Sequence, residues 1–264
     1  HGVFDFTTRQ GYSVRFTAGS VRECATLFAR LDKLGLACAC IGFPATYPPE
    51  RLEHGVFVSG WDAPVAFAAD ASFVWPPSLH TEMARRFGAT SFDDVDEFDA
   101  DSPGWHAKLP DALRARVSRK VAFARWLLDA REWDLFAVYF GESDTGAHHL
   151  WAHHDPTSPR ALCLRGEERT GLTQVYAALD GAVGALSEAA GDGVETTVLS
   201  DHGSGGSSDV VLYLNRALEE AGLLQFHPPS WRSSAAGHLK DLALTLLPGA
   251  LRERVFRIAG SRLP

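Results

Sequence analysis

Two short stretches of the chain place an aspartate and a histidine directly after an apolar run. Asp144 and His148 follow the run 135–140, and Asp201 and His202 follow the run 196–199. Carboxylate oxygen and imidazole nitrogen are ligands that suit zinc and other first-row divalent ions. The residue types therefore predict a metal site that draws on both stretches.

The position of these residues supports the same interpretation. Each apolar run is typical of a buried strand, and in open α/β sheets ligands gather in the crevice at the carboxyl ends of the strands. Asp144 and His148 are four residues apart, so they share one face if the chain turns helical there. The adjacent Asp201 and His202 could face a second ion. Either pair alone is more often a capping or hydrogen-bonded pair than a metal site, whereas both together favour one shared crevice.

Length and composition favour a globular protein that acts on a small molecule. The chain has 264 residues, 45% of them hydrophobic, which suits one large α/β domain or one domain with an insertion. Its net charge of -8, without a basic block, gives no indication of binding to nucleic acid or anionic membranes. No apolar run approaches the roughly 18 to 20 residues of a membrane span, so we expect a soluble chain.

The cysteines are expected to be small buried hydrophobes, and a reducing cytoplasm fits them. All four stand in apolar or small-residue surroundings: Cys24, Cys38, Cys40 and Cys163. A redox or metal pair at Cys38 and Cys40 is the less favoured alternative, because alternate residues of one strand face the same side and burial alone explains them.

Helical and strand patterns alternate along the chain, which predicts the α/β class. A helix is expected at 20–35, with Ser20 and Glu23 as a capping box and Gly35 as its stop. Further helices are expected at 112–130, 167–190 and 213–221, and strands at 37–43, 56–58, 134–140 and 196–199. Periodicity weakens between 62 and 110. We therefore expect a single discontinuous domain, with core parts at 1–61 and 112–264 and a cap or insertion at 62–111.

Several motifs together resemble the type I phosphodiesterase and nucleotide pyrophosphatase group of the alkaline phosphatase superfamily. The Ser-Asp-His-Gly sequence at 200–203, directly after an apolar run, is the most specific of them. The others lie at 1–6, 43–50, 58–64, 133–136, 144–151 and 213–216. The resemblance implies an alkaline-phosphatase-like fold, with a mostly parallel central sheet, helices on both faces and a cap. It also implies hydrolysis of a phosphodiester or a related phosphate ester.

Proteins of that group use two metal ions, commonly zinc, and a threonine or serine that attacks phosphorus. By resemblance, Asp144 and His148 would hold one ion, and Asp201 and His202 the other. The chain begins with His1, so we expect it to be a piece of a longer product whose nucleophile and first metal aspartate precede His1. A late histidine ligand has no convincing counterpart, since neither His227 nor His238 stands in the family's motif. The isolated chain is therefore expected to be inactive or impaired.

Other readings of the sequence stay open. Tyr47 and Trp151 are candidates for the substrate pocket, although large aromatic residues are more often core or rim. His149 and His153 have a spacing that could bind metal, but a polar helix surface is the more ordinary role. The alternative functions are a degenerate, non-catalytic family member that binds a ligand or partner, and a sulfatase or phosphotransferase of the same superfamily.

Overall fold

The computed structural model describes residues 7–10, 13–60, 71–88, 100, 102–163 and 167–226. The chain divides into two compact units, residues 1–8 with 16–207 and residues 9–15 with 208–264, and each is described by itself. The first unit contains the central sheet and the predicted metal ligands. The second unit contains helix α6 (Leu214–Glu220) and most residues of the strands β1 (Thr7–Gln10) and β2 (Ser13–Phe16). These two strands pair as a two-stranded sheet.

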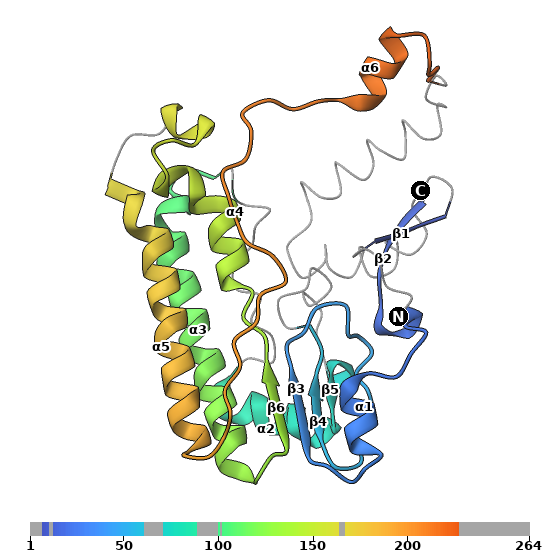
Figure 1. Ribbon diagram of the computed structural model, residues 1–264, viewed down its shortest axis with the longest axis vertical. Coiled ribbons are helices and arrows are strands. Elements are labelled where there is room, and N and C mark those ends of the chain that lie inside the picture. Colours follow the sequence, from blue (N-terminus) through green and yellow to red (C-terminus); the bar gives the residue numbers. More distant parts are fainter. Residues whose placement is uncertain are drawn as a thin grey trace. The chain divides into compact units, whose positions relative to one another are not determined.

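A four-stranded sheet with the order β5-β4-β3-β6 forms the centre of the first unit (Figure 1). Strands β3 (Cys38–Ile41), β4 (Val56–Val58) and β6 (Leu135–Val138) run parallel, and the short β5 (Val74–Trp75) is antiparallel to β4. The three strands predicted at 37–43, 56–58 and 134–140 are thereby confirmed. Because the parallel strands share a direction, the loops that follow β3, β4 and β6 leave the same edge of the sheet.

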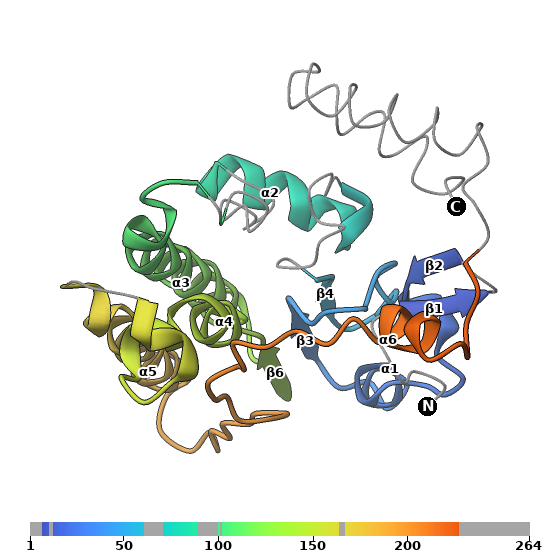
Figure 2. The ribbon, with the colours of Figure 1, turned by 90° about the horizontal axis from the view of Figure 1, so that it is seen from above.

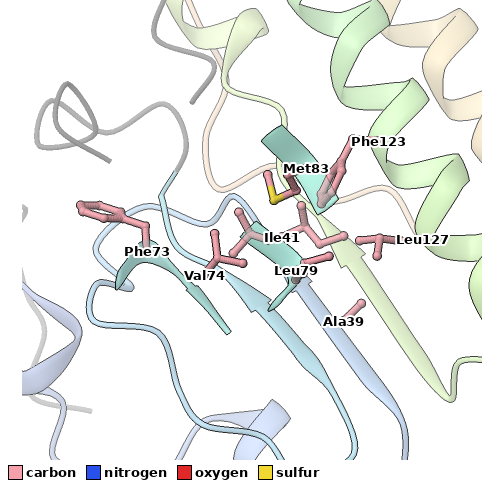
Figure 3. Close-up of a cluster of buried hydrophobic side chains, with 9 residues drawn as sticks. Ala39, Ile41, Phe73, Val74, Leu79, Met83, Phe123 and Leu127 are labelled. Atoms are coloured by element: carbon pink, nitrogen blue, oxygen red, sulfur yellow. The ribbon is translucent and has the colours of Figure 1, made fainter. Parts of the chain in front are cut away.

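Helices cover both faces of the sheet. Alternate residues of β3 face opposite sides, so this one strand contributes to the apolar core on each face. Cys38 and Cys40 pack with Leu52 and Phe57 beneath helix α1 (Leu27–Asp32). Ala39 and Ile41 face the other layer, where α2 (Pro77–Phe87) and α3 (Trp105–Ala130) supply the apolar contacts. Figure 3 shows Ile41 close to Met83 of α2 and to Phe123 and Leu127 of α3. The burial expected for two of the cysteines is confirmed, whereas Cys24 is exposed.

A second core lies between α3, α4 (Glu142–His154) and α5 (Gly171–Ala190), which lie side by side in Figures 1 and 2. It is built from buried side chains of all three helices: Leu109, Leu113, Ala147, Leu150, Leu172 and Val175. The start of α5 and helix α3 approach closely at Gly171, where a Cβ atom would lie only 2.7 Å from the Pro110 ring. This core anchors α4, the helix that carries Asp144 and His148.

Two helix boundaries differ from the sequence prediction. The helix expected at 20–35 is shorter: residues 19–21 form a 3₁₀ turn, and α1 begins after Thr26, whose hydroxyl accepts a hydrogen bond from the Ala29 amide. Thr26 therefore caps the helix instead of Ser20, and the helix ends at Asp32 with Lys33 as its C-cap, before the expected stop at Gly35, whose φ is 78°. Helix α3 begins at Trp105, so Pro110 lies inside it.

The strand predicted at 196–199 is not formed. Residues 191–213 carry no helix or strand and are exposed, with Val198 at 69% and Leu199 at 87% of full exposure. Apolar, β-branched residues form a strand only where a sheet edge pairs with their amides, and in this structure β6 pairs with β3 alone among the described strands. In α5, the apolar side chain of Val183 is likewise exposed, at 37%.

The range 62–111, expected as a cap or insertion, contains elements that pack on the sheet. Strand β5 pairs with β4, and Leu79 and Met83 of α2 are buried in the main core. Residues 61–70 and 89–99, which include part of the motif at 58–64, lie outside the described residues, as do His1, His227 and His238. The boundaries of the predicted cap stay a prediction. In the described part of the chain, no helix is long and apolar enough to cross a membrane.

Candidate metal centre

Asp144 and His148 are positioned by the transition from β6 to α4. The strand ends at Val138, the Tyr139 amide still donates to the Ile41 carbonyl, and α4 begins at Glu142. This order confirms the helical turn expected directly after the strand. Asp144 and His148 lie one turn apart, and their facing atoms Oδ1 and Nε2 are 3.5 Å apart. Both side chains remain accessible at the carboxyl edge of the sheet.

The second pair comes to the same place although its predicted strand is absent. His202 lies in the segment that follows α5, and its Nε2 is 4.0 Å from Asp144 Oδ1 and 3.7 Å from Asp201 Oδ2. The same segment passes α4 further along, where a Cβ atom on Gly206 would lie 3.4 Å from the Trp151 ring. The structure therefore links the two predicted pairs through Asp144 and His202, which lie more than fifty residues apart in the sequence.

The spacing of these donors agrees with shared metal ligation. Zinc binds nitrogen and oxygen at about 2.0–2.2 Å, so two ligands of one tetrahedral ion lie about 3.4 Å apart. The separations within the two pairs, 3.5 Å for Asp144 with His148 and 3.7 Å for Asp201 with His202, are close to that value, and 4.0 Å separates Asp144 of one pair from His202 of the other. However, no three His, Cys, Asp or Glu side chains of the described residues converge as a metal-binding group. The donors thus fit a divalent ion by type and by pairwise spacing, without forming a closed site.

The imidazole of His202 is oriented by its own backbone. Nδ1 lies 2.9 Å from the Gly203 carbonyl oxygen, which can only accept a hydrogen bond, so Nδ1 carries the hydrogen. In the neutral ring Nε2 then holds the lone pair, and this is the atom that faces Asp144 and Asp201. Histidine ligands are commonly fixed in this way by a carbonyl behind the ring. The hydrogen bond thus leaves Nε2 as the nitrogen of His202 that could bind a metal ion.

The same contacts predict how zinc binding depends on pH. The Gly203 carbonyl, with the Asp201 and Asp144 carboxylates, raises the pKa of His202 above its ordinary value of 6.5. A proton on Nε2 competes with metal, so zinc affinity should fall as the pH is lowered through the His202 pKa. We expect up to about tenfold weaker binding per pH unit below that pKa from this one group. Zinc titrations between about pH 6 and 8 test this, with His202→Ala as the control that should show a flatter profile. Equal affinity across this range in the wild-type chain would contradict the assignment.

The two aromatic residues proposed for the substrate pocket have structural contacts. Tyr47 is 36% exposed, stacks on Phe73 with ring centroids 4.2 Å apart, and lies in the loop that follows β3. Trp151 is on α4, packs on the second core, and its Nε1 donates to Asp155 Oδ2 at 3.3 Å. Asp155 also accepts from the hydroxyl and amide of Thr157, which lower its pKa. The role of both aromatics toward a substrate stays a prediction.

The other histidine pair of α4 belongs to a ring cluster with the start of α3. The His149 ring lies 4.8 Å from Trp105 and 6.0 Å from His106, and the His153 ring lies 5.4 Å from His106. These rings are half-buried, which corrects the expectation of a plain polar surface. The cluster packs α4 against the beginning of α3.

Sequence reasoning missed a buried ion cluster beside the candidate centre. Glu142 Oε1 accepts from Arg116 Nε at 2.9 Å and lies 2.6 Å from Lys120 Nζ. The side chains of Glu142 and Lys120 are fully buried, and that of Arg116 is 4% exposed. One signal was present in the sequence, because Arg116 and Lys120 occupy inward positions of the helical repeat that contains Leu113 and Leu127.

Fold and site together define an α/β protein with carboxylate and imidazole groups gathered at the carboxyl edge of a mostly parallel sheet. This is the fold class that the sequence predicted. A sequence model of the type I phosphodiesterase / nucleotide pyrophosphatase family matches residues 1–255, and the chain belongs to this family. No curated protein and no solved structure matches the chain. The family's chemistry is hydrolysis of phosphate esters, which confirms the coarse functional expectation.

Proposed function

We propose that this protein hydrolyses a phosphodiester or a related small phosphate ester with two divalent ions, zinc being the expected metal. The observation that carries the proposal is the position of Asp144 Oδ1, which lies 3.5 Å from the His148 imidazole and 4.0 Å from the His202 imidazole. Two motifs distant in the sequence thus meet at one carboxylate. The family match supports the same chemistry independently.

Each residue has a defined part in this proposal. Asp144 and His148 hold one ion from α4, and Asp201 and His202 hold the other from the segment after α5. The hydrogen bond from Nδ1 to the Gly203 carbonyl directs Nε2 of His202 toward the site. When bound, such ions neutralise charge on the phosphoryl oxygens and lower the pKa of an attacking oxygen. The attacking group is proposed to be a threonine or serine outside residues 1–264, as the family resemblance implies.

The exposed position of the four residues suits a small, charged substrate. Their side chains are between 45% and 84% exposed, so a phosphate ester can reach them directly. Tyr47 and Trp151 are proposed to contact the non-phosphate part of the substrate. The free thiols of Cys38 and Cys40 fit the cytoplasmic location that the sequence suggested.

The proposal is tested by hydrolysis assays on the full-length product of the gene. Bis(4-nitrophenyl) phosphate, 4-nitrophenyl phosphate and 4-nitrophenyl sulfate are compared at equal concentration, with zinc and with a chelator. We expect the diester to be cleaved fastest and activity to be lost with the chelator. Faster cleavage of the sulfate ester would assign a sulfatase, and no cleavage of any ester would support the non-catalytic alternative.

A further inference from the structure

Besides the metal ligands, α4 carries a side chain that is buried and ionic, Glu142. It is the first residue of the helix and stands two residues before Asp144. Arg116 and Lys120 lie one turn apart on α3 and both contact the same oxygen, Oε1, at 2.9 and 2.6 Å. Oε2 is buried without a hydrogen-bond partner among the described residues. Glu142 is therefore bound to α3 through a single oxygen between two cations.

The side chain of Glu142 joins the first turn of α4 to α3. The N-cap residue of α4 is Gly141, and no side chain caps the helix. The residues between Glu142 and Gly146 are polar, and the buried apolar residues of α4, Ala147 and Leu150, come later. Apolar packing therefore holds the middle of α4, whereas the contacts of Glu142 hold its beginning.

The beginning of α4 is also the part that carries Asp144. Glu142 and Gly146 lie on the buried face of the helix, while Asp144 and His148 lie on the accessible face. Successive residues of a helix are rotated by about 100°, so a change in rotation that moved Glu142 away from α3 would move Asp144 away from His202. The direction of the Asp144 carboxylate thus depends on where Glu142 is bound.

We infer that Glu142, held by Arg116 and Lys120, is a positioning residue that sets the geometry of Asp144 and His148 for the metal ion. This inference rests on the proposed function. Glu142 is fully buried and acts through the helix rather than by touching metal or substrate. Partners behind the ligands of a metal commonly contribute in this way to affinity.

The test is zinc affinity of Glu142→Gln, which removes the charge and keeps the shape, measured by calorimetry on the full chain. We expect zinc to bind about tenfold more weakly, at the low end of the loss seen when a group hydrogen-bonded to a metal ligand is removed, because Glu142 acts only through the helix. The matched control is Leu113→Ala, which opens the same α3–α4 core without touching the ions. It should lower the melting temperature and keep zinc affinity. Arg116→Met is a milder variant that leaves the contact of Lys120 with Glu142 in place and should weaken binding in the same direction.

Hydrogen exchange of the metal-free chain separates this inference from the proposed function. Glu142→Gln should speed exchange of the amides in the first turn of α4 more than Leu113→Ala does. If wild-type chain binds no zinc, the proposed function fails, and the exchange data still test the position of the helix. Unchanged zinc affinity and unchanged exchange in Glu142→Gln, or an equal loss of zinc affinity in Leu113→Ala, would overturn the positioning role.

Discussion

An Asp144→Ala variant is expected to bind zinc about 100-fold more weakly than the wild-type chain and to lose turnover. A zinc ion held by four ligands is bound with about 10–16 kcal/mol, so one ligand contributes about 2.5–4 kcal/mol, which corresponds to about 100-fold or somewhat more in affinity. Asp144 should show the full effect, because its Oδ1 faces the imidazoles of both His148 and His202. Calorimetric zinc titration measures the first loss, and phosphodiester hydrolysis by the full-length product of the gene measures the second.

The control for this variant is Asp111→Asn on α3. Asp111 is an exposed aspartate whose carboxylate pairs with Arg114 at 3.1 Å, within its own helix. Its replacement removes one negative charge from the chain without changing any predicted ligand, so zinc affinity and turnover should stay at the wild-type level. Full zinc affinity in Asp144→Ala, or an equal loss in Asp111→Asn, would refute the role of Asp144 as a ligand.

The second large effect is expected in stability, from the buried ion cluster. Glu142→Ala leaves the Arg116 and Lys120 cations buried without this carboxylate, and removing one partner of a buried ion pair commonly costs about 3–5 kcal/mol. The loss should be seen as a lower free energy of unfolding in urea. The charge-matched comparison is Glu82→Ala on α2, which removes an exposed carboxylate that pairs with Arg85 and Arg86 and should leave the free energy of unfolding nearly unchanged.

Replacing the whole cluster should behave differently from breaking it. The triple variant Arg116→Met, Lys120→Met and Glu142→Leu buries apolar side chains in place of three charges, and such exchanges are often neutral or stabilising by about 1–4 kcal/mol. We expect it to recover most of the stability that Glu142→Ala loses, while zinc affinity stays reduced. A Glu142→Ala variant within about 0.5 kcal/mol of wild type, as for ordinary surface substitutions, would show that the cluster has no such energetic role.

Much of the fold could be predicted because its signals are local. The continuous apolar runs at β3 and β6 indicate buried parallel strands by themselves, and the four-residue spacing of Asp144 and His148 needs only the helix that follows β6. The cap of α1 was misplaced, because Ser20 with Glu23 and Thr26 both offer suitable capping groups. The Thr26 hydroxyl accepts from the Ala29 amide and also donates to the carboxylate of Glu50, a residue that is distant in the sequence.

The features that could not be predicted depend on partners elsewhere in the chain. Residues 196–199 have the composition of a strand, but a strand also requires a neighbour, and the sequence does not say which edge is available. Arg116, Lys120 and Glu142 were overlooked because charged side chains are seldom fully buried, and only the tertiary structure shows that they face one another. The meeting of Asp144 with His202 was expected from strand ends, yet in the structure it occurs without the second strand.

The most direct test of the proposed metal centre is a calorimetric titration of the wild-type chain with zinc, followed by titration with inorganic phosphate. The account predicts that zinc binds, that binding is weakened by His148→Ala and by Asp201→Ala, and that phosphate binds the zinc-loaded chain but not the zinc-free chain. Absence of zinc binding, or phosphate binding that is the same with and without zinc, would contradict it.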